Sequence, residues 1–115
     1  MRAFLLAGFL ALAVIASAGP AAAADVQLFV RHEVADYAAW RKAFDGFQAK
    51  AHKMGATSGT VYRSVDNPND VTVRHGFKSA EKAKAFIGSP ELNAAMEGAG
   101  VKGAPQTWIT NVATK

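Results

Sequence analysis

Residues 26–33 read VQLFVRHE and residues 36–54 read DYAAWRKAFDGFQAKAHKM, and these neighbouring stretches decide how the fold begins. In the first, apolar and polar residues alternate, which places Val26, Leu28 and Val30 on one face and is typical of a half-buried strand. In the second, apolar residues recur every three or four positions, which is typical of an amphipathic helix. We therefore expect a strand followed by a helix that packs against it.

Capping and turn residues divide the rest of the chain. Asp36, Ser79 and Ser89 each carry a side-chain oxygen that can cap a helix, and DNPND at residues 66–70 has the composition of a turn. The expected elements are a strand over 26–33, a helix over 36–54, strands over about 59–65 and 71–77, a helix after Ser79, a short helix after Ser89, and a strand over 107–112 that follows a loop with Gly103 and Pro105. This β-α-β-β-α-β order predicts an α+β, ferredoxin-like domain whose antiparallel sheet has helices on one face and a bare second face.

The first 24 residues have the three-part organisation of a secretory signal. Arg2 is the single charge before Asp25, an apolar run over residues 4–15 follows it, and Ala22-Ala23-Ala24 offers the small-residue pattern that signal peptidase recognises. The alternative is an uncleaved anchor, but the run is shorter than the roughly 20 residues that a membrane span needs. We expect a signal peptide over 1–24, one domain over 25–115, and a periplasmic or secreted protein that is free of the membrane after cleavage.

Composition excludes several kinds of chemistry. The chain has no cysteine, which rules out disulfides, thiolate metal sites and a cysteine nucleophile. Its net charge of +4 comes without a basic run, so nucleic acid is not an expected partner. No phosphate-binding loop, nucleophile elbow or dinucleotide fingerprint is present, and we expect no cofactor. A mature domain of about 90 residues buries only about 60–65% of its unfolded surface, so a homodimer would gain stability.

Three stretches carry a family resemblance. They are VADYAAW at 34–40 with Phe44-Asp45, the DNPND turn at 66–70, and SPEL at 89–92 with Ala95-Met96 and Ala99-Gly100-Val101. Together they resemble the small dimeric α/β-barrel proteins related to the antibiotic-biosynthesis monooxygenases, a group with cyclase-like and uncharacterised members. The resemblance covers nearly all of the mature domain, and it rests on helix-packing and turn residues.

The resemblance implies an assembly and a choice of functions. In that group two subunits press their bare sheet faces together, and the shared barrel interior holds the ligand. Some members oxidise aromatic polyketides without metal or flavin, and others degrade haem or use chlorite-type chemistry. The haem-degrading members use an Asn–Trp–His arrangement, and Asn111, Trp108 and His75 do not stand at the expected places along this chain. The export signal also argues against a role in a biosynthetic pathway.

Strand register predicts what the bare face carries. Strands 26–33 and 71–77 are central neighbours in this topology, and matching their apolar faces puts Val73, His75 and Phe77 under the helices. Arginine offers a rigid fork of donors for carboxylate or phosphate, and aromatic walls suit a flat organic ligand. The expected ligand-binding residues are Phe29, Arg31, Tyr62, Arg74 and Trp108, with Thr72 and Ser64 on the same face.

That assignment has alternatives. Arg31 would pair with Glu33 or with an acid across the dimer, and Phe29 would be interface core, because arginine at interfaces commonly has a packing role. Trp108 is equally consistent with core, dimer contact or pocket wall, because either face of the last strand suits it.

The three histidines do not have the spacing of a metal site. His32 and His75 share the apolar face but are offset by about four residues, roughly 13 Å along a strand, whereas zinc needs every ligand about 2 Å from one centre. His52 lies among lysines on the first helix. His75 is the candidate catalytic residue, a general base with a near-neutral pKa. The alternative is a core histidine with its hydrogen bonds satisfied.

Two classes of function follow. The first is an exported small-molecule-binding dimer that acts as a cofactor-independent monooxygenase or cyclase-like enzyme on an aromatic or anionic ligand, with Arg31 or Arg74 stabilising an enolate. The second is a non-catalytic periplasmic binding or stress-related accessory protein, which the absence of an evident acid–base pair favours. Consumption of O₂ separates the two.

Overall fold

The computed structural model describes residues 26–113, so the expected export signal lies outside the described residues. The elements are β2 (Val26–Val34), α2 (Tyr37–Lys53), β3 (Ser58–Arg63), β4 (Asp70–Phe77), α3 (Ala80–Ile87), α4 (Pro90–Gly98) and β5 (Val101–Thr110). Among residues 26–113, none of the helices combines the length and the apolar character needed to cross a bilayer.

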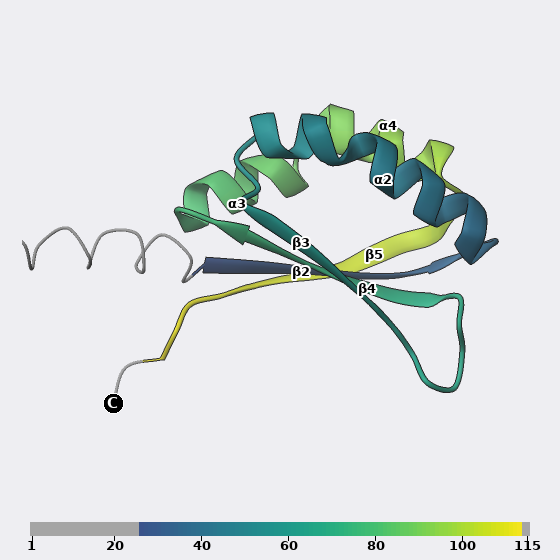
Figure 1. The fold of residues 1–115 in the computed structure, drawn as a ribbon. Helices are drawn as coiled ribbons and strands as arrows, with labels where there is room; N and C mark the ends of the chain where they lie inside the picture. Colours follow the sequence, from purple (N-terminus) through teal and green to yellow (C-terminus); the bar gives the residue numbers. More distant parts are fainter. Residues whose placement is uncertain (1–25, 114–115) are drawn as a thin grey trace, which may run out of the picture.

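One antiparallel sheet organises the domain. Its strand order is β3-β4-β2-β5, so β2 and β4 are the central strands, as the topology predicts. All three helices lie on one side of this sheet, and the other side carries no element of residues 26–113 (Figure 1). The α+β, ferredoxin-like fold class is therefore confirmed, with the second helical region divided into α3 and α4.

Each helix begins at the capping residue that the sequence indicates. A side-chain oxygen of Asp36 accepts from the backbone N–H of Ala39 at 2.9 Å. Ser79 and Ser89 accept in the same way from N–H groups three residues further along, each at 3.2 Å. These caps satisfy donors that the first helical turn leaves free, so they fix where α2, α3 and α4 start.

The register between β2 and β4 sets the two faces of the sheet. Val26 pairs with Phe77, Leu28 with His75 and Val30 with Val73. All six side chains are buried, which confirms that this is the face under the helices.

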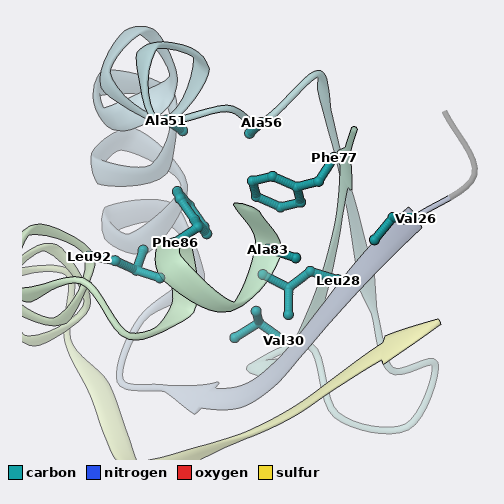
Figure 2. Packing of buried hydrophobic residues seen from close by; sticks show 9 residues of the cluster. All are labelled: Val26, Leu28, Val30, Ala51, Ala56, Phe77, Ala83, Phe86 and Leu92. Carbon is teal, nitrogen blue, oxygen red and sulfur yellow. The ribbon is translucent and has the colours of Figure 1, made fainter. Parts of the chain in front are cut away.

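The main hydrophobic core lies where α3 packs on that face. Phe77 and Phe86 are almost completely buried, with ring centroids 5.3 Å apart, and Leu28 packs beside them (Figure 2). A second cluster at the other end of the sheet contains Trp40 and Val71. Between the two clusters, the space under α2 and α4 is less completely filled.

The expected start of the last strand is wrong. β5 begins at Val101, and Gly103 and Pro105 lie inside the strand. Arg31 pairs with Gln106 whereas Glu33 pairs with Lys102, so the extra β5 residues bulge out of the ladder. Gly103, with φ 72°, takes the left-handed conformation that the bulge requires. Pro105 is tolerated because β5 is an edge strand.

The expected end of the first hairpin strand is also corrected. β3 stops at Arg63, and Ser64 belongs to the turn. The Ser64 hydroxyl accepts from the backbone N–H groups of Asp66 and Asn67 at 3.2 and 3.3 Å. The backbone N–H of Ser64 still donates to the carbonyl oxygen of Asp70 at 2.9 Å, so Ser64 connects the hairpin to its turn and its side chain is used within that turn.

Candidate functional site

The bare face of the sheet brings together all five residues expected to bind ligand. Phe29 pairs with Arg74 on one side and with Trp108 on the other, which forms one row across the sheet. Arg31 and Tyr62 both pair with Thr72 in the next row. We call this surface the open face and define it by Phe29, Arg31, Tyr62, Arg74 and Trp108.

Aromatic rings dominate the middle of the open face. The rings of Phe29 and Trp108 are stacked, with centroids 5.3 Å apart and planes 5° apart. Trp108 is 43% exposed and Tyr62 is 45% exposed. The ambiguity over Trp108 is thus resolved in favour of the open face, and its exposure makes it available to a partner.

Arg31 is committed to an ion pair. Its Nε and Nη2 donate to the two carboxylate oxygens of Asp70 at 3.0 and 2.7 Å. This contact raises the pKa of Arg31 and lowers that of Asp70. The alternative in which Arg31 pairs with Glu33 is wrong, since Oε2 of Glu33 lies 4.0 Å from Nζ of Lys102 instead. Because Asp70 occupies the guanidinium fork, Arg31 has little capacity left for an anionic ligand.

Arg74 is less well satisfied. Its Nη2 is 3.5 Å from the hydroxyl of Thr60, which is a long hydrogen bond. Its Nε is buried and has no hydrogen-bond partner among residues 26–113. Arg74 is therefore the arginine of the open face whose guanidinium N–H groups can form a further hydrogen bond.

A second candidate site lies on the opposite side of the sheet. We call it the helix-side pocket, a cavity of about 50 Å³ between the sheet and helices α2 and α4. Its wall consists of Val30, His32, Trp40, Ala43, Phe44, Phe47, Val73, His75, Phe86, Leu92, Ala95, Met96 and Ala99. The two imidazoles are the only titratable groups in this wall. No residue of the open face contributes to it.

A hydrogen bond to the backbone determines which ring nitrogen of His75 carries the hydrogen. Its Nδ1 lies 3.2 Å from the carbonyl oxygen of Ser58. A carbonyl can only accept, so Nδ1 carries the hydrogen and the lone pair lies on Nε2. Burial lowers the pKa of His75, only partly offset by the bond to Ser58, so the ring is neutral near pH 7.

His32 lies in the same wall but is held differently. The side chain is 7% exposed, and its ring meets Trp40 edge-on with centroids 5.7 Å apart. Its Nδ1 is buried without a hydrogen-bond partner among residues 26–113. Burial also lowers the pKa of His32, so this imidazole is neutral near pH 7 as well.

Within residues 26–113, no three His, Asp or Glu side chains gather closely enough to hold an ion. What sequence reasoning missed is the pocket itself. Trp40 and Phe44 lie on the apolar stripe of α2, as expected, but they are pocket wall as well as core. The available signal was a pair of histidines on an otherwise apolar strand face.

Comparison with known proteins finds similarity only among solved structures. No protein-family model matches the chain, and no curated protein does. A putative antibiotic biosynthesis monooxygenase from Bordetella bronchiseptica is 14% identical, with a TM-score of 0.67 over 77% of this chain and 97% of that one. A second putative antibiotic biosynthesis monooxygenase, from Caulobacter crescentus CB15, is 22% identical, with a TM-score of 0.60 over 77% of this chain and 90% of that one.

A third similar structure has a described activity. SnoaB, a cofactor-independent oxygenase from Streptomyces nogalater, is 16% identical, with a TM-score of 0.62 over 80% of this chain and 97% of that one. At these identities the similarity establishes the fold. The chain has the ferredoxin-like fold of the antibiotic biosynthesis monooxygenase-like proteins, in agreement with the resemblance seen in the sequence.

Proposed function

We propose that this protein binds a compact, uncharged aromatic compound in the helix-side pocket and oxygenates it with O₂, without a cofactor. The observation that carries the proposal is His75, with its Nδ1–H bound to Ser58 and its lone pair on Nε2, in a wall that is apolar apart from His75 and His32. The fold shared with SnoaB supports the same reaction class. An anionic ligand is disfavoured at this site, because the pocket wall contains no lysine or arginine.

The proposed reaction starts with proton removal by His75. Nε2 takes a proton from an acidic CH₂ group of the substrate, which leaves a delocalised carbanion. The carbanion gives its electrons to O₂, and a new C–O bond forms a peroxide anion, whose outer oxygen takes the proton back from His75. His75 then removes the second hydrogen of the same carbon as a proton, the electrons of that C–H bond form the C=O bond, the O–O bond breaks, and the hydroxide that leaves takes the proton from His75 to become water. One CH₂ and one O₂ become one C=O and one H₂O.

The size of the pocket limits the ligand. A dry cavity that holds benzene measures about 150 Å³, whereas the helix-side pocket measures about 50 Å³. A ring therefore enters only if wall side chains move. Phe44 and Met96 are half-buried in this wall, and methionine adapts readily to a new shape. We expect single-ring or bicyclic ligands and the exclusion of larger ones.

We propose that the open face forms a homodimer interface, with the five expected residues lining the shared barrel. The exposed, stacked pair of Phe29 and Trp108 supports this role, because large apolar groups on a sheet face mark interaction sites. Arg74 would then use its spare donors across the interface. The export of the protein to the periplasm or beyond is likewise a proposal, and it rests on the pattern of residues 1–24.

A matched pair of alanines tests the location of the ligand. Ala95 lies in the pocket wall on α4, and its neighbour Ala94 is exposed outside it. We expect Ala95→Leu to fill the cavity and to weaken the binding of 4-ethylphenol at least about tenfold, which corresponds to 1.4 kcal/mol. Ala94→Leu should bind as the wild type does. Equal binding by both variants, with unchanged melting temperatures, would remove the helix-side pocket as the site.

Oxygen uptake tests the reaction. We expect wild-type protein to consume O₂ with 2-indanone, whose CH₂ groups lie between a ring and a carbonyl, and to form one product molecule per O₂. His75→Gln should bind the compound but lose turnover by about 10²–10⁴-fold, the usual contribution of a general base. Binding without O₂ uptake by the wild type would favour the non-catalytic binding protein instead.

A further inference from the structure

Four exposed lysines lie where α2 ends and α3 begins. They are Lys50, Lys53, Lys78 and Lys82. The two stretches that carry them lie against each other, because a side chain at Gly55 would meet Cδ of Lys82 at 3.8 Å and the ring of Phe77 at 3.7 Å. We call residues 50–55 and 77–82 the lysine end of the domain.

The domain does not neutralise the positive charge of the lysine end. Glu81 is the one acidic residue of these two stretches, against four lysines. The ion pairs among residues 26–113 join Arg31 to Asp70, Arg41 to Asp45, and Lys102 to Glu33. None of them includes a lysine of this end, so its charge remains available to attract a negatively charged partner.

The residue types at the lysine end fit a surface of spread-out negative charge. Arginine, which grips a single phosphate with two donors, is absent from these stretches, whereas lysine is a compact charge on a flexible stem. Phe77 is buried, so this end offers no phenyl or indole ring on which a nucleobase could stack. An anionic lipid surface needs neither feature, and each nearby lysine raises the affinity for it about fivefold.

The position of the lysine end in the chain also favours lipid. Val26 begins β2 and pairs with Phe77, so residues 1–25 join the domain at this end. Figure 1 shows α3 beside the start of β2. While the expected signal is attached, its apolar run over residues 4–15 would keep this end of the domain next to the membrane.

We propose that the lysine end holds the exported domain reversibly against an anionic lipid bilayer, through contacts between its lysines and the headgroup phosphates. Cleavage removes the apolar run and leaves this attraction in place. The contact is peripheral and depends on salt, because it involves exposed charges alone. Its setting rests on the export proposed above, and it is independent of the helix-side pocket.

Vesicle sedimentation measures this contact. The protein used is residues 25–115, which contain the whole described domain without the signal. We expect it to bind vesicles that contain phosphatidylglycerol and not vesicles of phosphatidylcholine alone. Binding should disappear as the salt concentration rises toward about 1 M, where charges are screened within about 3 Å.

Matched variants locate the contact. Lys53→Glu and Lys42→Glu each reverse one exposed lysine of α2, so their net charges are equal. We expect Lys53→Glu to weaken binding to phosphatidylglycerol at least about tenfold, and Lys42→Glu, near the other end of α2, to weaken it less than about threefold. Lys82→Glu should act as Lys53→Glu does. Glu81→Gln should strengthen binding about fivefold, because it removes the one acid of this end.

Several outcomes would overturn the proposal. They are no binding to phosphatidylglycerol, equal binding to both kinds of vesicle, and equal losses in Lys53→Glu and Lys42→Glu. Tighter binding of soluble polyphosphate at the same phosphate concentration would assign the lysine end to a soluble polyanion and not to lipid. If a charge reversal lowers the melting temperature, Glu81→Gln still decides, since unchanged binding by that variant contradicts the proposal. Cell fractionation tests export separately, and vesicle binding is measured whatever its result.

Discussion

Trp40 is part of the hydrophobic core and also lines the helix-side pocket. It is 3% exposed, stacks on Phe44 with centroids 5.0 Å apart and meets His32 edge-on. The periodicity of α2 predicts that Trp40 is buried. Whether a buried ring fills its surroundings or borders a cavity depends on the shapes of α4 and β4 opposite, and periodicity carries no information about those shapes.

Removal of the Trp40 ring should cost much of the stability. We expect Trp40→Ala to lower the free energy of unfolding by about 3–5 kcal/mol, as for other buried aromatic residues. Lys42→Ala, an exposed change on the same helix, should alter it by less than about 0.5 kcal/mol. Urea denaturation of the two variants gives both values. A loss below about 1 kcal/mol for Trp40→Ala would show that the α2 stripe is not core.

The buried histidines make stability depend on pH. Burial lowers the folded-state pKa of His32 and His75 below the ordinary 6.5, so the unfolded chain binds protons more readily. The free energy of unfolding should be constant above about pH 7 and should decrease as the pH drops through 6.5 toward the folded-state pKa values. The slope approaches about 1.4 kcal/mol per pH unit for each histidine.

Denaturation between pH 7.5 and 5 (roughly the range where histidines titrate) measures this effect. His75→Gln should make the fall shallower, because one of the two groups is gone. A wild-type stability that stays constant over the whole range would contradict the burial of neutral imidazoles.

The sequence predicts the helix starts and turns that depend only on neighbouring residues. The caps at Asp36, Ser79 and Ser89 and the DNPND turn depend on neighbouring residues, and the structure confirms them. The start of β5 was mispredicted because this strand is held by pairing with β2, which is distant in the sequence. The pairing contains a bulge, and the Gly–x–Pro stretch at the bulge has the composition of a loop. Gly103 and Pro105 are breakers in isolation, and only the pairing shows that they lie in an edge strand.

Gly46 and Gly103 both have room for a larger side chain, but they differ in backbone conformation. At both Gly46 and Gly103 an added Cβ would meet nothing within 4 Å, but Gly46 is helical in α2 and Gly103 has φ 72°. Gly46→Ala should raise the free energy of unfolding by about 0.5–1 kcal/mol. Gly103→Ala should lower it by about 1–2 kcal/mol, the cost of a left-handed non-glycine residue. Chemical denaturation gives the signs, and a stabilising Gly103→Ala would contradict the bulge in β5.

For the whole molecule, register was enough to predict the open face. Alternation along the strands indicates which side chains share a face, so Phe29, Arg31, Tyr62 and Arg74 were grouped correctly from the sequence. The sequence left Trp108 undecided between the two faces, and its pairing with Phe29 places it on the open face. The ion pair of Arg31 with Asp70 and the pocket beneath the helices were not predicted. Both depend on side-chain positions across strands and layers.

The open face should assemble the molecule. At micromolar concentration we expect sedimentation to give twice the monomer mass, because the exposed Trp108 and Tyr62 would be covered in a dimer. Trp108→Asp should shift the protein toward monomer. Val65→Asp, in the exposed turn after β3, should not. A folded wild-type monomer at these concentrations would rule out the barrel.

The central claim is that ligand binds between helices and sheet, against His75, and not on the open face. The most direct measurement is nuclear magnetic resonance of the histidine side chains, labelled with ¹⁵N, during titration with 4-ethylphenol. We predict that the Nε2 signal of His75 shifts progressively while His52 and the indole N–H of Trp108 stay unchanged. A shift of the Trp108 indole with a constant His75 signal would contradict the account and place the ligand on the open face.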